Sequence, residues 1–205
     1  TVEESIRKRR FGDVVRLMVE KETPEFLRNI LEENLNVDKR DVYPITRPMV
    51  LSNLMQIARL DRHDLKDRTF IAATPRPLRL TKDSENDAIF TAIRQGNILL
   101  HQPYDSFTPV IEFLKAAARD PNVLAIKQTL YRVGNNSPVV KALLQASREY
   151  GKQVAVLVEL KARFDEESNI GWARLLEQEG VHVTYGLVGL KTHSKIALVV
   201  RREGE

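Results

Sequence analysis

The 205-residue chain is long enough for one large domain or two small ones, and its 42% hydrophobic content supports a core of normal size. It has no cysteine, which excludes a disulfide framework, a cysteine-ligated zinc site and thiol catalysis. A net charge of +4 fits either a solvated mixed surface or a surface that attracts nucleic acid or a phosphate polymer. No apolar run approaches the ~20 residues that a membrane span needs, and no signal peptide is visible.

The first part of the chain, to about residue 85, has an irregular pattern. Residues 11–20 alternate like a strand, and the segments 23–35 and 47–60 have the apolar spacing of helices. Thr23 is predicted to cap the first of these helices, with Pro24 at its first position. The stretch 74–87 is rich in proline and charge and is the best candidate for a domain boundary.

From residue 87 onward, helices and strands alternate regularly. Helices are predicted at 87–96, 106–120, 137–151 and 165–180. Strands are predicted at 97–102, 122–132, 152–160, 181–186 and 195–200. This order predicts an α/β domain built on a largely parallel sheet.

Polar and charged side chains gather at the predicted strand ends, where open α/β sheets bind their ligands. They are Lys127, Tyr131 and Arg132 toward the end of one strand, Glu159, Lys161 and Arg163 around the end of the next, and Lys191, His193 and Lys195 around the start of the last. Arginine binds phosphate through its planar fork and lysine acts as a point charge, so this edge is predicted to bind phosphate. The alternatives are that the arginines are surface or ion-pair residues and that Glu159 simply pairs with Lys161 or Arg163.

His193 differs from the other histidines because a lysine lies two positions away on each side. A neutral imidazole is a good nucleophile toward phosphorus, and surrounding cations would stabilise the phosphoryl group that it accepts. The alternative is a structural histidine. Neither a GxxxxGK[ST] loop nor a kinase glycine loop is present, so any phosphoryl transfer belongs to a different class.

His193-Ser194-Lys195 resembles the start of the phospholipase D motif HxKxxxxD, but Val200 stands where the acid would be. A more specific resemblance lies in four segments: "FIAATPRPL", "VLAIKQTLYR", "VELKARFDEESNIGWARLLEQEGVHVTYG" and "GLKTHSKIALVVRRE". Together they resemble the long-type bacterial polyphosphate kinase, over essentially the whole chain.

The resemblance implies a two-part fold. Residues 1–86 would be the later part of a mixed α+β head domain. Residues 87–205 would be the first phospholipase-D-like α/β catalytic domain, with a largely parallel sheet and truncated at its C-terminus. The chain is therefore expected to be an internal fragment of a longer protein and to be inactive by itself.

The resemblance also implies an activity, which is reversible transfer of the ATP terminal phosphate to inorganic polyphosphate with Mg²⁺ and a phosphohistidine intermediate. His193 would be the phosphorylated nucleophile and Lys195 its catalytic neighbour, while Lys127 and Lys191 would bind phosphate. Arg132 and Arg163 match the family's magnesium-associated positions. Because a guanidinium has no free lone pair, both are expected to bind phosphate oxygens that the metal bridges.

The partners that follow are ATP or ADP and polyphosphate, with a homo-oligomeric parent, no specific nucleic acid and no transmembrane segment. The expected location is the cytoplasm, and membrane association of the parent is left open. Two alternatives stay open: a phospholipase-D-type phosphodiesterase or nuclease, and a non-catalytic module that binds polyanions.

Overall fold

The computed structural model describes residues 2–9, 11–46, 49–79, 88–134, 136–186 and 189–204. Its contacts divide the chain into two compact units, one of Thr1–Ile6 with Phe70–Glu205 and the other of Arg7–Thr69. The boundary predicted at residue 86 lies outside the described residues and stays a prediction. In the part of the chain that is described, no helix is both long and apolar enough to cross a bilayer.

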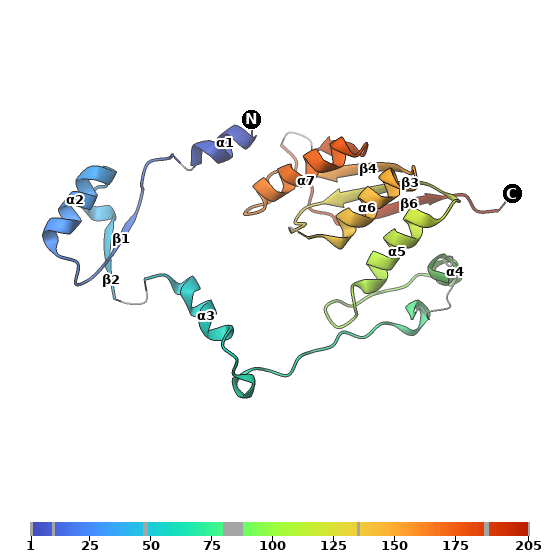
Figure 1. Cartoon of the computed structure of the whole chain (residues 1–205), viewed down its shortest axis with the longest axis horizontal. Helices are drawn as coiled ribbons and strands as arrows, with labels where there is room; N and C mark the ends of the chain where they lie inside the picture. Colours follow the sequence, from blue (N-terminus) through green and yellow to red (C-terminus); the bar gives the residue numbers. More distant parts are fainter. Residues whose placement is uncertain are drawn as a thin grey trace. The chain divides into compact units, whose positions relative to one another are not determined.

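The smaller unit is built around two short strands in parallel (Figure 1). Strand β1 (Leu17–Glu20) pairs with β2 (Val42–Ile45), and helix α2 (Glu25–Leu35) connects them. Pro24 occupies the cap position of α2 and no side chain caps the helix, so the prediction that Thr23 is the cap is wrong.

The helix predicted at 47–60 is shorter in the structure. A 3-10 turn at Leu51–Leu54 continues into helix α3 (Met55–Ala58), and Pro48 lies outside the described residues. No residue of either element is buried, so no packing within the described chain extends the helix beyond α3. The remaining N-terminal helix, α1, spans Val2–Arg9.

The larger unit is a four-stranded sheet with helices packed on it. Its strands are β3 (Val123–Leu130), β4 (Gln153–Val158), β5 (His182–Tyr185) and β6 (Ala197–Arg201), in the spatial order β5-β4-β3-β6. Its helices are α4 (Ala88–Gln95), α5 (Thr108–Arg119), α6 (Pro138–Arg148) and α7 (Glu166–Gln178). The pairs β3-β4 and β4-β5 are parallel and β3-β6 is antiparallel, so the prediction of a largely parallel sheet is confirmed.

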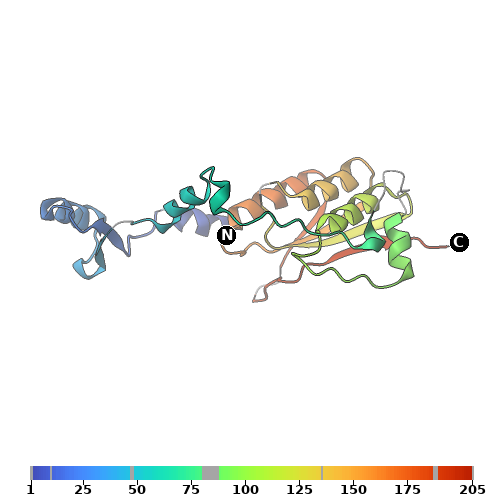
Figure 2. The same ribbon diagram turned by 90° about the horizontal axis from the view of Figure 1, so that it is seen from below.

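The core lies on one face of this sheet, beneath α5, α6 and α7 (Figures 1 and 2). Side chains alternate along a strand, so Ile126 and Leu130 of β3 face the helices and are buried together with Leu143 of α6. Helix α6 begins where the sequence dictates, because Ser137 Oγ accepts the Val140 N–H and Pro138 occupies the first turn. The opposite face of the sheet carries Lys127 and Leu198, both exposed.

The strand predicted at 97–102 is absent, because these residues pair with no strand. Ile98 and Leu100 pack against the core while Leu99 is 90% exposed, which accounts for the alternation in the sequence. An extended segment that packs through alternate side chains gives the same pattern as a strand. The edge of β3 that it could have joined is taken by β6.

Candidate functional site

The predicted site lies at one edge of the four-stranded sheet. The parallel strands β3, β4 and β5 all end at this edge, and β6, which runs the other way, begins there. Tyr131 and Arg132 follow β3, and His193 and Lys195 precede β6. The direction of β6 therefore brings the histidine segment to the same edge as the ends of the parallel strands.

The ring of Tyr131 is the common contact of the candidate residues. The rings of Tyr131 and His193 meet edge to face, with centroids 4.7 Å apart and planes at 75°. The Lys195 ammonium is 4.3 Å from the Tyr131 ring centroid and the Lys191 ammonium 5.6 Å, while the Arg132 guanidinium lies 5.5 Å away. Four of the six predicted site residues therefore surround one aromatic ring.

The two arginines are linked through the loop that follows β4. Arg132 Nη2 donates to the Arg163 carbonyl at 3.1 Å, and Arg132 Nε lies 3.2 Å from Asp165 Oδ2. The Arg163 guanidinium is exposed, lies 5.0 Å from the centroid of the Phe164 ring, and makes no ion pair within the described ranges. Phe164 has a φ of 75°, which L-residues rarely adopt. The described residues thus offer Arg163 no carboxylate partner that would make it an ion-pair residue.

Glu159 anchors the segment that carries His193. Its carboxylate is buried and accepts two backbone N–H groups, from Lys161 to Oε1 at 2.9 Å and from Thr192 to Oε2 at 2.7 Å. The alternative that Glu159 pairs with the side chain of Lys161 or Arg163 is therefore wrong. One carboxylate instead joins the end of β4 to the residue before His193.

Two further contacts hold the same segment against β3. Thr129 Oγ1 donates to the Ser194 carbonyl at 2.7 Å and accepts the Ile196 N–H at 2.8 Å. Lys191 Nζ donates to the Lys161 carbonyl at 3.2 Å, and Lys195 Nζ donates to the His193 carbonyl. These contacts bracket His193 on both sides along the chain.

Asn169 of α7 connects the backbone at the ends of β3 and β4. Its side chain is fully buried, and Nδ2 donates to the Tyr131 carbonyl at 2.6 Å and to the Glu159 carbonyl at 2.9 Å. Sequence reasoning did not select Asn169 or Thr129. A lone amide in the "ESNIGWARLL" segment, facing the sheet from a helix, is the signal that could have identified Asn169.

Replacing Asn169 with alanine is expected to lower the free energy of unfolding by about 2 kcal/mol, because two buried carbonyl groups lose their donor. Urea denaturation of the larger unit measures this change. The control is Asn122→Ala, since Asn122 is exposed and its replacement should change stability by less than about 0.5 kcal/mol. Equal effects of the two substitutions would contradict a structural role for Asn169.

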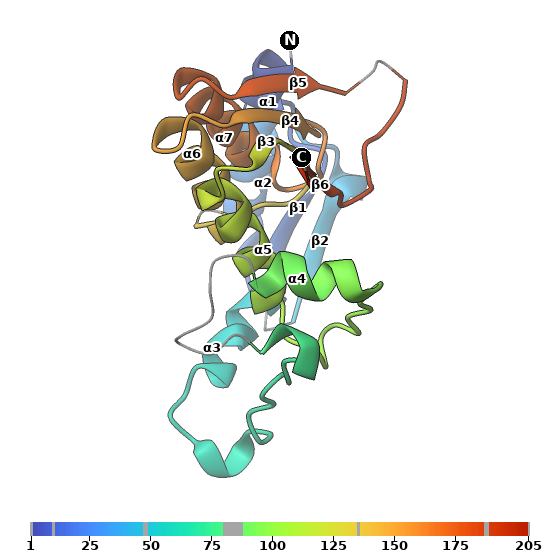
Figure 3. The same ribbon diagram turned by 90° about the vertical axis from the view of Figure 1, so that its right-hand side faces the viewer.

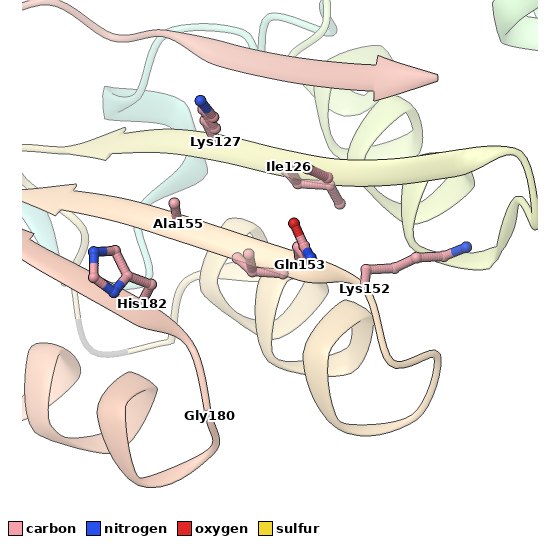
Figure 4. A pocket seen from close by; sticks show the side chains of 9 residues that line it. Ile126, Lys127, Lys152, Gln153, Ala155, Gly180 and His182 are labelled. Atoms are coloured by element: carbon pink, nitrogen blue, oxygen red, sulfur yellow. The ribbon is translucent and has the colours of Figure 1, made fainter. Parts of the chain in front are cut away.

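Lys127 is not placed with the other candidates. It lies inside β3, three residues before the strand ends, and projects beside a shallow depression that Ala155 and His182 also line (Figure 4). No contact joins it to Tyr131 or His193 in the described chain. The expectation that Lys127 sits at the strand end is therefore wrong, because β3 runs on to Leu130, and its binding of phosphate stays a prediction.

A cavity of about 930 Å³ opens at the site. Tyr131, Arg132, His193 and Lys195 line its polar part, and Leu100 and Val110 belong to its apolar part. The carboxylates near the polar part are already engaged, Glu159 by backbone N–H groups and Asp165 by Arg132. In the described chain Lys191 and Lys195 therefore have no carboxylate partner and can bind an anion that enters from solvent.

Tyr185, the last residue of β5, also ends at this edge. Its hydroxyl donates to Glu177 Oε1 at 2.9 Å. Partial burial and, after it, the Glu177 carboxylate raise the pKa of Tyr185, so the phenol stays protonated at neutral pH.

The protein groups at this edge do not form a direct magnesium site. Mg²⁺ prefers oxygen ligands in octahedral geometry, whereas the candidates are arginines, lysines and a histidine. In the ranges that the structure describes, no group of three or more His, Asp or Glu side chains could hold a metal ion. A magnesium ion would have to be held by oxygens of the bound phosphates.

Two family models match the chain. Residues 88–205 match the family model of the polyphosphate kinase C-terminal domain 1, and residues 1–57 match that of the polyphosphate kinase middle domain. The chain is 56% identical over 203 residues to polyphosphate kinase 1 of Chlorobaculum tepidum, covering 99% of this chain and 28% of that protein. It is 53% identical over 204 residues to a polyphosphate kinase of Mycobacterium tuberculosis, covering 99% of this chain and 27% of that protein.

The fold is also similar to a solved structure. The crystal structure of a polyphosphate kinase from Porphyromonas gingivalis superposes with a TM-score of 0.71 at 27% identity, over 95% of this chain and 29% of that one. The chain thus spans just over a quarter of the length of the relatives that it matches. On these matches, the chain belongs to the polyphosphate kinase family.

Proposed function

We propose that the protein carrying this chain transfers the terminal phosphate of ATP to inorganic polyphosphate, reversibly, through a phosphohistidine at His193. The observation that carries the proposal is the clustering of His193 with Lys195, Lys191 and Arg132 around the Tyr131 ring. Membership of the polyphosphate kinase family supports the identity of donor and acceptor. Since the chain covers 28% of a relative, the activity is proposed for the protein at the length of its relatives.

The first half of the reaction forms a bond from His193 to phosphorus. A nitrogen lone pair of the neutral imidazole attacks the terminal phosphorus, and the bond from that phosphorus to the bridging oxygen breaks. ADP leaves with the electron pair. Lys195, Arg132 and Arg163 stabilise the equatorial phosphoryl oxygens, where most of the catalytic effect in phosphoryl transfer arises.

The second half returns His193 to its starting state. A terminal oxygen of polyphosphate attacks the phosphorus, the phosphorus–nitrogen bond breaks, and the imidazole recovers its lone pair. The chain grows by one phosphate. Run backwards with ADP as acceptor, the same steps make ATP, so the site catalyses both directions.

The remaining features are proposed together with this function. Residues 1–86 would belong to the head domain and 87–205 to the first catalytic domain. Mg²⁺ would be held by the substrate phosphates next to Arg132 and Arg163. The parent is proposed to be a cytoplasmic homo-oligomer without specific nucleic acid, and the 205-residue chain alone to be inactive.

Two alternatives predict different chemistry at the same edge. A phospholipase-D-type phosphodiesterase would need an acid at position 200, but Val200 lies in β6 opposite Ala125. A non-catalytic module would bind polyphosphate through the same cations without forming ADP. The binding module does not explain why a histidine lies among the cations around the Tyr131 ring.

The assay that tests the function uses a protein that contains this chain and has the length of its relatives. ATP, Mg²⁺ and short polyphosphate are supplied to it. We expect ADP release that depends on polyphosphate, lengthening of the polyphosphate, and ATP formation when ADP is supplied instead. Hydrolysis of a phosphodiester substrate without ADP formation would support the phosphodiesterase. Tight polyphosphate binding with neither reaction would support the binding module.

A further inference from the structure

The Tyr131 side chain contacts more of the candidate site than any other described residue, yet the proposed chemistry gives it no role. The His193 ring packs edge to face against the Tyr131 ring. The charged groups of two lysines and one arginine lie 5.6 Å or less from the Tyr131 ring centroid. We propose that the Tyr131 ring is a positioning surface that orients the His193 imidazole and gathers the cations before phosphate binds. This inference rests on the proposed function.

The cations of the site repel one another, so each needs a favourable contact within the protein. Arg132 pairs with Asp165, whereas Lys191 and Lys195 donate to backbone carbonyls and make no ion pair in the described chain. A carboxylate beside the lysines would neutralise them and would also repel the incoming phosphate. An aromatic face attracts cations through its quadrupole and carries no net charge, so phosphate oxygens can replace it without repulsion.

The ring also constrains the direction of the imidazole. Edge-to-face packing is a preferred geometry for two aromatic rings, with centroids roughly 4.5–7 Å apart, and the observed pair falls in this range at 4.7 Å and 75°. An imidazole that is held in one orientation reacts faster than one that rotates freely. Tyr131 therefore acts on the reaction through His193.

The backbone of Tyr131 is itself fixed. It follows the buried Leu130 at the end of β3, and its carbonyl oxygen accepts a hydrogen bond from the side-chain Nδ2 of Asn169 at 2.6 Å. Thr129, two residues earlier, holds Ser194 and Ile196. The Tyr131 ring and the segment that carries the His193 imidazole are thus both held at the C-terminal end of β3.

The contacts involve the ring and not the phenol oxygen. In the described part of the chain, the Tyr131 hydroxyl makes no hydrogen bond, whereas four groups contact the ring. Phenylalanine would keep the ring and its negative face. Leucine would fill a similar space without a quadrupole, and a fluorinated phenylalanine would keep the shape while weakening the negative face.

The test uses a protein that contains this chain and has the length of its relatives. It measures the rate at which γ-labelled ATP phosphorylates His193, at saturating ATP and across pH. Tyr131→Leu is expected to lower the rate about 10- to 30-fold, and Tyr131→Phe to recover it to within about threefold of wild type. A fluorinated phenylalanine at position 131 is expected to fall about fivefold below Tyr131→Phe, because only the attraction for cations is weakened. The fluorinated variant also tests the inference if Tyr131→Leu does not fold.

The control is Tyr150→Leu, which removes a partly exposed tyrosine at the end of α6 and should leave the rate unchanged. Labelling of Tyr131→Leu within threefold of wild type, or an equal loss in Tyr131→Phe and Tyr131→Leu, would overturn the inference. Equal rates for phenylalanine and its fluorinated analogue would overturn the cation-gathering role. A wild-type protein that carries no label at His193 would overturn the proposed function itself, so the two failures are distinguishable.

Discussion

His193→Gln is expected to abolish both the labelling of the protein by γ-labelled ATP and the synthesis of polyphosphate. Glutamine has no nitrogen lone pair that can attack phosphorus, so no covalent intermediate forms. The fold should be unaffected, because His193 is exposed and the segment around it is held through its neighbours Thr192 and Ser194. Activity is expected to fall at least about a thousandfold, to the detection limit of the assay.

The matched control is His63→Gln. His63 is exposed, belongs to the smaller unit and, among the described residues, pairs with the exposed Asp61. This variant should be labelled and should synthesise polyphosphate as the wild type does. Full synthesis by His193→Gln would leave His193 a structural residue.

Arg163→Lys is expected to lower turnover by roughly 10²- to 10³-fold while the protein stays folded. Lysine keeps the positive charge but loses the planar fork that binds two phosphate oxygens at once. Arg163 is exposed and makes no ion pair in the described ranges, so the substitution breaks no structural contact of that kind. Steady-state kinetics of polyphosphate synthesis measure the effect.

Arg148→Lys provides the comparison for Arg163. Arg148 lies at the end of α6 with its side chain 72% exposed and pairs loosely with Glu179 at 3.6 Å. Its replacement should change turnover by less than about twofold, since an exposed pair of this kind contributes little. Unchanged turnover in both variants would show that Arg163 does not hold the transferring phosphate.

The sequence predicted the sheet and the edge of the site because both depend on local patterns. A near-continuous apolar run marked β4, and polar residues at the ends of β3 and β4 marked where both strands stop. The position of Arg132 followed from the rule that parallel strands end at one edge. His193 reaches the same edge because β6 runs antiparallel to β3, which the sequence pattern did not show.

The errors arose where tertiary contacts decide the outcome. The alternation at 97–102 reports packing against the core and not strand pairing, because β6 holds the edge of β3. The alternative in which Glu159 pairs with Lys161 or Arg163 is wrong because the backbone N–H groups of Lys161 and Thr192 occupy its carboxylate. Lys127 is predicted at the strand end together with Tyr131 and Arg132, but β3 continues three residues past it, to Leu130.

The sequence also could not reveal the contacts that organise the site. The role of Asn169 depends on two carbonyl groups at the ends of different strands. The four contacts of the Tyr131 ring come from its neighbour Arg132 and from the segment before β6. Such arrangements appear only once the sheet is assembled (Figure 3). Composition and spacing carry no signal for them beyond the presence of a polar or aromatic residue near a strand end.

The central claim, that His193 accepts the phosphoryl group, is tested most directly by locating the phosphate on the protein. A protein that contains this chain and has the length of its relatives is incubated with γ-labelled ATP and Mg²⁺ without acceptor. It is then digested at alkaline pH, and the phosphopeptides are fragmented under conditions that preserve the phosphorus–nitrogen bond. We predict one acid-labile, base-stable phosphate in the peptide containing residues 191–195, carried by His193, and its loss as ATP when ADP is added. A phosphate on another residue, or an acid-stable phosphate on Ser194 or Thr192, would contradict the account.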